Sequence, residues 1–404
     1  MLVIPILGIL VLVVTLIVGI RLRAPILSCY YSFVGFSLLY CSYMFIGSLI
    51  ETGGLSLLED LEIIHYVMLS TFMGIFFFVA FYYREATFRI KYYSCIPELK
   101  KVWRINKIIF LPFYTVLLIA LIIYAKKYGW HAVSRDGVEG IEPSLFAYGK
   151  YFFVCMGLLA LWCAPLSKRW VGFILITQTV LMMFDGGRTT FFGIVVAYAW
   201  ILSRRGLTPR ISHVIYVLLF GLLLLATRSL VLESGLVNGM LGSLIAEGIF
   251  AGYTGLQMAD YVRGGGDLLY GLTYLVDPII YLLPKGIRDE HLFIQLSVGN
   301  YIGLERFAPL GGFFWIAEAI ANFGFLGGAI VGSLYGYFLA KLECDQRNGG
   351  YYSIFVIAAI GCLLSKYNFA NGIKIMIFYL GAAFLIRLFF VRDQFISAPV
   401  NQPA

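Results

Sequence analysis

The chain has 404 residues, of which 61% are hydrophobic and only 13% are charged. Soluble domains carry about 45–50% apolar and about 25% charged residues, so this composition predicts that lipid surrounds most of the chain. It excludes a cytosolic enzyme, a nucleic-acid-binding protein and a disordered chain. The net charge of +8 is then expected to come from basic loops on the cytoplasmic side of a membrane.

Long apolar segments follow one another from the first residues onward. A bilayer core of about 30 Å is crossed by about 20 apolar residues in a helix, and about eleven such segments can be marked. They cover approximately residues 2–20, 25–50, 62–83, 107–125, 145–165, 170–184, 189–203, 211–227, 313–340, 351–366 and 373–391. The sequence therefore predicts an all-α, polytopic transmembrane helix bundle that forms a single domain over residues 1–404.

Basic residues are concentrated in alternate connections between these segments. One set of connections holds most of the 30 basic residues and few of the 22 acidic ones. Its basic members include Arg21, Arg84, Arg204, Lys341 and Arg387. Because basic loops stay in the cytoplasm, this pattern predicts an N-terminus outside and a C-terminus inside.

The longest outer connection, residues 228–312, is too long to be a simple connector. Residues 237–261 and 268–283 within it are semi-apolar and carry a few polar residues, Asp277 among them. We expect amphipathic helices that lie in the outer interface or dip into it. The alternative is a pair of further spans, which would put Arg263 on the inner side.

A set of basic side chains falls on the outer side, where the topology rule depletes positive charge. A guanidinium group suits the bidentate capture of phosphate oxygens, so these residues are candidates for binding a lipid-linked pyrophosphate. The candidates are Arg188, Arg228, Arg263, Lys285, Arg288 and Arg306. Each of them could instead anchor the chain at the interface or form an ion pair.

Two residues are candidates for a general base. Glu318 lies about one and a half turns below the outer end of a predicted span, and a carboxylate there points to function. Its alternative role is a structural ion pair with an arginine. His291, in the long outer loop, is the second candidate, either as a base or as a sugar contact. Tyr301 belongs to an outer group of aromatic residues that suits an interfacial belt or the stacking of sugar rings.

Cofactor and metal motifs are missing from the sequence. It contains no phosphate-binding loop, no dinucleotide fingerprint and no HExxH spacing. The seven cysteines form no CxxC pair, which predicts neither a disulfide framework nor a zinc site. We therefore expect a protein without cofactor or metal.

Two stretches resemble motifs of Wzy-type O-antigen polymerases, which are related to O-antigen ligases. Phe184-Asp-Gly-Gly-Arg188-Thr189 is similar to the small-residue-then-arginine motif that opens a span in that family. Gly311–Gly324, which contains Glu318 followed by Asn-Phe-Gly, is similar to its later, glycine-rich motif. The large outer loop with Tyr-Leu-Leu-Pro-Lys285 also fits.

The resemblance implies a GT-C-like glycosyltransferase of the bacterial inner membrane, metal-independent and inverting. It would join undecaprenyl-pyrophosphate-linked repeat units at the periplasmic face, with a glycan donor and acceptor, the bilayer, a chain-length regulator and a flippase as partners. Arginines would hold the pyrophosphate, and a carboxylate or histidine would deprotonate the acceptor.

Two positions depart from the family patterns. Phe313 stands near the place of the ligases' histidine, which favours a polymerase over a ligase. The RX10G pattern of some polymerases is missing at Arg188, because Ala199 occupies the eleventh place after it. A lipid-linked oligosaccharide flippase or other transporter and an O-antigen ligase stay open as alternative functions.

Overall fold

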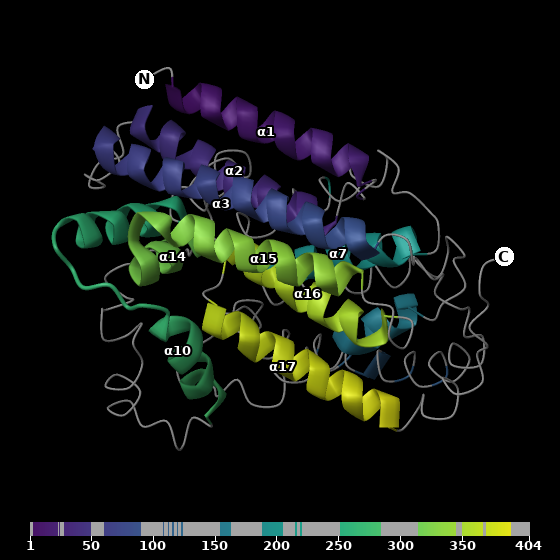
Figure 1. Cartoon of the computed structure of the whole chain (residues 1–404). Helices are drawn as coiled ribbons and strands as arrows, with labels where there is room; N and C mark the ends of the chain where they lie inside the picture. Colours follow the sequence, from purple (N-terminus) through teal and green to yellow (C-terminus); the bar gives the residue numbers. More distant parts are fainter. Residues whose placement is uncertain are drawn as a thin grey trace.

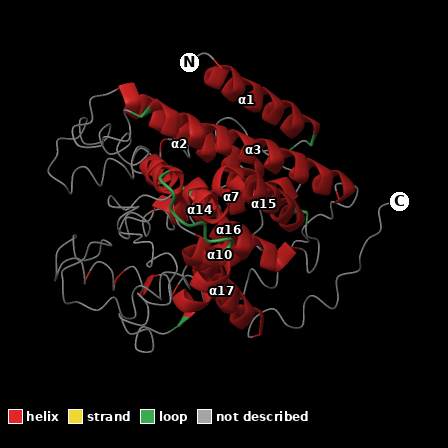
Figure 2. Ribbon diagram, turned by 60° about the vertical axis from the view of Figure 1, so that its left-hand side comes forward, coloured by secondary structure: helices red, strands yellow, loops and turns green. Residues whose placement is uncertain are grey.

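The computed structural model describes residues 3–22, 28–49, 60–89, 154–162, 188–204, 251–283, 314–344, 350–366 and 369–388, and a few single positions between residues 24 and 219. Within these ranges the regular structure is helical and contains no strand, as Figure 2 shows. The prediction of an all-α fold is confirmed to this extent.

The helices follow the predicted apolar segments. Their bounds are α1 Val3–Arg21, α2 Cys29–Leu49, α3 Leu61–Arg89, α7 Arg188–Arg204, α10 Leu272–Leu282, α14 Trp315–Phe323, η4 Gly324–Leu326, α15 Gly327–Glu343, α16 Tyr351–Lys366 and α17 Phe369–Ile386. Residues 154–162 and 251–263 are helical as well. The predicted spans 107–125, 170–184 and 211–227 lie almost entirely outside the described residues, as does about half of 145–165.

The long helices lie side by side in a bundle (Figure 1). α3 and α15 pack against each other at its centre, α1 and α2 cover one side of this pair, and α16 joins it to α7 and α17 on the other side. Large aromatic side chains fill the middle, with Phe33 stacked on Phe78 at a centroid distance of 4.2 Å and Trp315 next to Phe33 at 5.1 Å.

Contacts around Glu343 show which helix termini meet at one end of the bundle. The carboxylate of Glu343 accepts hydrogen bonds from the Cys29 backbone N–H and from the Tyr82 hydroxyl. Its backbone carbonyl accepts from Trp200 and from Arg204, each at 3.0 Å. The start of α2 therefore meets the ends of α3, α7 and α15, and we call this the basic end.

At the opposite end, which we call the acidic end, α3 begins with Asp60 and Glu62. Asp60 accepts hydrogen bonds from the backbone N–H groups of Glu62 and Ile63 at 2.9 and 3.1 Å, as an N-cap residue does. Arg21, Arg84, Lys341 and Arg387, predicted to face the cytoplasm, sit at or just past helix ends that point to the basic end. The charge alternation that was read from the sequence thus corresponds to two ends of one bundle.

Glycines bring α15 unusually close to α3. A Cβ atom at Gly328, Gly332 or Gly336 would lie 1.9, 2.1 or 2.3 Å from a backbone oxygen of α3. The three glycines are four residues apart, so they line one face of α15, and the oxygens they meet are equally spaced along α3. Only glycine allows this backbone approach, which is typical of helix pairs packed through small residues.

The predicted span 313–340 is not one continuous helix. The ring centroids of Trp315 and Tyr335 are 6.3 Å apart, whereas twenty residues of continuous helix would separate them by about 30 Å. The chain instead rises along α14 to the acidic end, turns at η4 and returns along α15. Gly324, with φ 61° and ψ −145°, makes the sharp turn that a residue with a side chain would resist. This corrects the prediction of a single span.

Residues 251–263 are helical and end at the acidic end. Gly255 packs among Val67, Ile316 and Phe314, so this helix is enclosed by α3 and α14, not laid flat on an interface. Its last residue, Arg263, meets Glu62 at the start of α3. Arg263 lies at the end opposite Arg204, so the alternative prediction, which put Arg263 on the inner side together with Arg204, does not fit this arrangement.

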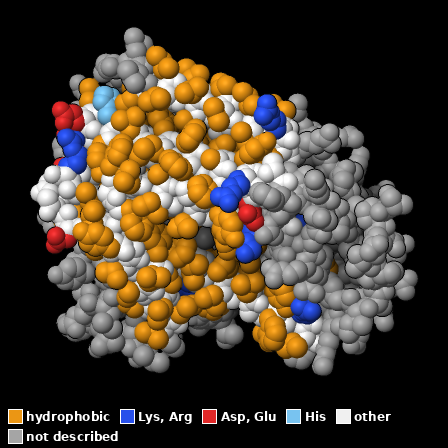
Figure 3. Space-filling view, in the orientation of Figure 1, with side chains coloured by type: hydrophobic (Ala, Val, Ile, Leu, Met, Phe, Trp, Pro, Cys, Tyr) orange, Lys and Arg blue, Asp and Glu red, His pale blue; other side chains and the backbone are white. Residues whose placement is uncertain are grey.

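The outer surface of the described bundle is apolar. Two helical stretches, Leu61–Thr87 and Trp315–Glu343, are long and apolar enough to cross a membrane, although the second is folded back at η4. On α10 the exposed residues include Leu275 at 69% and Ile279 at 65%, whereas Asp277 is buried. Figure 3 shows a broad hydrophobic band with charged side chains towards the two ends. A surface of this kind favours lipid as the surrounding solvent.

Candidate functional site

Glu318 lies in the first turn of α14 and is buried. Its Oε2 atom accepts a hydrogen bond from the backbone N–H of Phe369, the first residue of α17, at 2.9 Å. A second hydrogen bond joins its carboxylate to the side chain of Thr273 on α10. The carboxylate is therefore held between three helices, and the partial positive charge at the N-terminus of α17 stabilises it when it is ionised.

Asn322, one turn further along α14, fixes this arrangement. Its side-chain amide donates to Thr273 Oγ1 at 2.7 Å and to the backbone carbonyl of Glu318 at 2.8 Å. Its side-chain oxygen accepts from the Gly271 backbone N–H at 2.9 Å. Two backbone hydrogen bonds, from Leu269 to Ala321 and from Tyr270 to Asn322, complete the connection. Asn322 thus sets the position of α10 relative to α14.

Further polar groups surround the Glu318 carboxylate. Asp277 is buried on α10, one turn after Thr273, and lies close enough to interact electrostatically with Glu318. The hydroxyl groups of Tyr274 and Tyr335 also lie within electrostatic range of Glu318. Side chains from α10, α14 and α15 and the first turn of α17 therefore form one polar cluster inside an apolar bundle, the Glu318 cluster.

This cluster has the chemical capacity of a general base. A carboxylate offers about four lone-pair positions, and the described contacts of Glu318 use two of them. A substrate hydroxyl can occupy a remaining position and give up its proton there. Among the described partners of Glu318 there is no cation, so the predicted ion pair with an arginine is not seen in this part of the chain.

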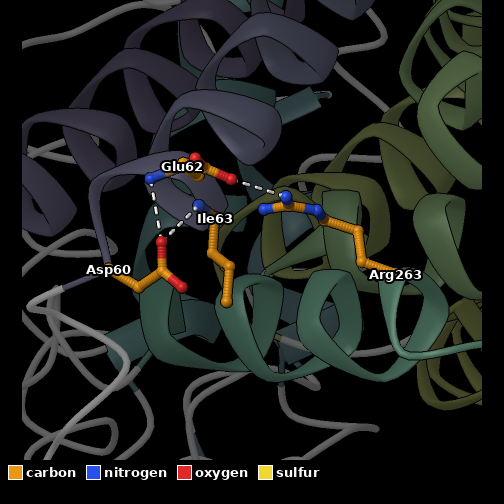
Figure 4. A network of polar contacts seen from close by, with 4 residues as sticks. All are labelled: Asp60, Glu62, Ile63 and Arg263. Carbon is orange, nitrogen blue, oxygen red and sulfur yellow. Dashed lines mark hydrogen bonds and ion pairs between the residues drawn. The ribbon is translucent and has the colours of Figure 1, made fainter.

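Arg263 has a different environment from the one that pyrophosphate binding alone would predict. It is exposed at the acidic end, and its Nη2 atom forms an ion pair with Glu62 Oε2 at 2.8 Å (Figure 4). The hydrogen bond to Glu62 raises the pKa of the guanidinium group, so Arg263 carries its charge throughout the physiological range. In the described contacts one donor nitrogen is engaged, and this partly exposed guanidinium group has further N–H donors that could bind an anion.

The other predicted site residues are not brought together by the described structure. The backbone of Arg188 begins α7, as the prediction of a span at residue 189 implies. Six further candidates lie outside the described residues: Arg228, Lys285, Arg288, His291, Tyr301 and Arg306. Their role in binding or catalysis stays a prediction. In the described part of the chain, no group of three or more His, Cys, Asp or Glu residues is arranged to hold a metal ion.

Thr273, Tyr274 and the Phe369 N–H group are members of the cluster that the sequence did not single out. The signal that pointed to Asp277, an acidic residue in an apolar segment, was available but was assigned to an amphipathic helix. Thr273 and Tyr274 resemble ordinary helix residues in the sequence. They come close to Glu318 only because α14 packs against the start of α10.

Comparisons of the chain with protein-family models, with curated proteins and with solved structures found no match.

Proposed function

We propose that this chain is an integral membrane glycosyltransferase that polymerises undecaprenyl-pyrophosphate-linked oligosaccharide repeat units, as in O-antigen synthesis. In this proposal about eleven spans form a GT-C-like bundle in the bacterial inner membrane, with the acidic end at the periplasmic face and the N-terminus outside. The observation that carries the proposal is the buried carboxylate of Glu318 near the acidic end, whose described partners include no cation, in a sequence that resembles the late polymerase motif.

The reaction requires few groups from the protein. A lipid-linked pyrophosphate is a good leaving group, so the enzyme needs cations to stabilise the charge that develops on it. Arg188, Arg228, Arg263, Lys285, Arg288 and Arg306 are the proposed cations, and Glu318 or His291 is the proposed base. Both substrates are tethered to the bilayer, which lowers the entropic cost of their encounter.

A short helix near the acidic end supports a site at that face. The nine residues of α14 reach only part of the way through the bundle, and they include Glu318 and Asn322 of the Glu318 cluster. Non-spanning helices at membrane depth are tolerated where they are enclosed in protein or line a polar cavity. The proposed acceptor site lies where α14 ends.

The test replaces Glu318 by glutamine, which keeps an oxygen for the Phe369 N–H group but cannot act as a base. In a deletion strain that carries this variant, we expect lipopolysaccharide with a single repeat unit and no long chains, at normal protein levels. The same loss is expected for Arg188→Ala and Arg228→Ala. Glu85→Gln, which alters a carboxylate near the basic end, is the matched control and should give a full ladder.

A second candidate function, a lipid-linked oligosaccharide flippase or other secondary transporter, is favoured by one specific arrangement. The fold-back of α14 onto α15 interrupts a helix beside two buried carboxylates, Asp277 and Glu318, and such interrupted helices occur at transporter binding sites.

Deletion strains separate the functions. A strain without a polymerase has core plus one repeat unit. A strain without a flippase accumulates lipid-linked units in the inner leaflet, and a strain without a ligase has core only. A full ladder from all three site variants would refute the assignment of these residues.

A further inference from the structure

The hydroxyl group of Tyr274 is enclosed by protein and makes no hydrogen bond to any residue that the structure describes. A buried polar group without a partner is uncommon, because leaving it unsatisfied costs free energy. The position of the ring is well defined: it is stacked on Phe323 with an interplanar angle of 7°, and it meets the edge of Phe369 at a centroid distance of 5.1 Å. The hydroxyl is therefore held in place without a hydrogen-bond partner among the described residues.

Three other hydrogen-bond donors near Glu318 already have partners among the described residues. The Phe369 N–H group and the Thr273 hydroxyl are both hydrogen-bonded to the Glu318 carboxylate. The side-chain amide of Asn322 donates hydrogen bonds to Thr273 and to a backbone carbonyl. Tyr274 lies within electrostatic range of the same carboxylate. It also shares a face of α10 with Asp277, three residues further on, as residues at this spacing do. Among the described residues, an unengaged donor thus lies beside a carboxylate with unused acceptor positions.

We propose that Tyr274 binds the acceptor sugar by donating a hydrogen bond to the hydroxyl oxygen that attacks the donor. This inference rests on the proposed function. In the step, the acceptor oxygen forms a bond to the anomeric carbon of the donor glycan, and its proton passes to the Glu318 carboxylate. The bond from the anomeric carbon to the pyrophosphate oxygen breaks, and its electron pair leaves with the lipid pyrophosphate. Glu318 then returns the proton to water.

A sugar hydroxyl has the donor and acceptor capacity that these two protein groups require. Its hydrogen is donated to Glu318, one lone pair accepts from Tyr274, and the second lone pair is directed to the anomeric carbon. The hydrogen bond from Tyr274 fixes the position of the acceptor oxygen before its proton leaves. A nucleophile that is held in this way is already oriented towards its target. Thr273 cannot replace it, because its hydroxyl is already directed at Glu318.

The experiment uses the purified full-length protein in detergent or nanodiscs. Its substrate is the undecaprenyl-pyrophosphate-linked repeat unit, extracted from the strain that lacks the protein. Wild type, Tyr274→Phe, Glu318→Gln and the control Tyr379→Phe are compared by kcat/KM and by melting temperature. Tyr379 is buried in α17, about 15 Å along the helix from Phe369, so its substitution also alters a buried tyrosine but away from the cluster.

We expect Tyr274→Phe to lower kcat/KM about tenfold, as the loss of one hydrogen bond to the reacting oxygen implies, with a melting temperature equal to or above that of wild type. Unchanged stability separates substrate binding from a structural role, because the hydroxyl has no partner to lose in the described protein. Tyr379→Phe should keep the wild-type kcat/KM.

Three outcomes would overturn the inference. If Tyr274→Phe is as active as wild type while Glu318→Gln is inactive, the proposed function stands and the role of Tyr274 is wrong. If the melting temperature of Tyr274→Phe falls together with its activity, the hydroxyl is structural. If the wild-type protein transfers no glycan under conditions where a known polymerase does, the proposed function and the inference fail together.

Discussion

The Glu318 carboxylate is positioned by groups that lie far apart in the sequence. Phe369 follows it by 51 residues and Thr273 precedes it by 45, yet both donate to it. The sequence singled out Glu318 because an acidic residue in an apolar segment is expensive unless it has a function. It could not identify the partners, since Thr273 and a backbone N–H group carry no distinguishing pattern. The Asn-Phe-Gly motif can be seen in the sequence. Its structural role, in which the hydrogen bonds of Asn322 connect α10 to α14, can be seen only in the folded chain.

Arg263 allows a sharp test at the level of single residues. Arg263→Ala and Glu62→Gln both remove the same exposed ion pair, which contributes little to stability. Only Arg263→Ala removes a cation. If Arg263 binds pyrophosphate, Arg263→Ala shortens the glycan ladder and Glu62→Gln leaves it intact.

The measurement is the ladder on a gel together with the melting temperature of each variant. Equal ladders from both variants would mean that Arg263 only joins the 251–263 helix to α3. An equal loss of long glycan chains in both variants would show that the ion pair itself, and not the cation, is required.

At the level of helices, the positions of most described elements followed from hydropathy, but the fold-back between α14 and α15 did not. A hydropathy window averages over apolar residues without regard to the direction of the chain. Residues 315–343 therefore look like one continuous span. Gly324 provides the turn, and it lies among many other glycines, so its positive φ has no separate signal in the sequence. The contacts of Trp315 with Phe33 and Tyr335 show the reversal.

The close packing of α3 and α15 predicts a strong effect from one added methyl group. A Cβ at Gly332 would lie 2.1 Å from the backbone oxygen of Gly74, so Gly332→Ala must push the helices apart. Overpacking of this kind costs about 1–3 kcal/mol, and we expect a lower melting temperature. Because α15 leads into the site through η4, transfer activity should fall as well.

Gly381→Ala is the matched control. A Cβ there meets nothing within 4 Å, and alanine favours the helical conformation of α17 by up to about 1 kcal/mol over glycine. The melting temperature of this variant should be equal to that of wild type or higher. A Gly332→Ala protein as stable as the control would contradict the close approach of α3 and α15.

For the whole molecule, composition and charge pattern predicted more than motifs did. They gave an all-helical fold and the grouping of basic residues, and the described helices place Arg84 and Arg204 towards one end and Glu62 at the other. The long outer loop was harder to predict. Residues 251–263 are enclosed, and α10 buries Asp277 and exposes leucine and isoleucine, the reverse of a helix in water. The distribution of polar and apolar residues along such a helix shows which of its faces is buried only when the neighbouring helices are known.

The two ends can be assigned to the two sides of the membrane by chemical labelling. Single cysteines are introduced at Glu62 and at Arg84, both exposed, and an impermeant thiol reagent is added to intact spheroplasts. The native cysteines of the described region, Cys29, Cys41, Cys155 and Cys344, are buried and should give little background. We expect labelling of Glu62→Cys alone, and labelling of both variants after the membrane is permeabilised. Labelling of Arg84→Cys in intact spheroplasts would place the catalytic proposal on the wrong side.

The fold-back at Gly324 also has a consequence for how the protein is made. The nine residues of α14 measure about 14 Å, less than half of a bilayer core of about 30 Å, so this segment cannot enter the membrane as an independent unit during synthesis. α14 has to insert together with α15, which packs closely against α3 through its glycines. The position of Glu318 therefore depends on two later parts of the chain: α15, which packs on α3, and α17, whose first N–H group holds the carboxylate.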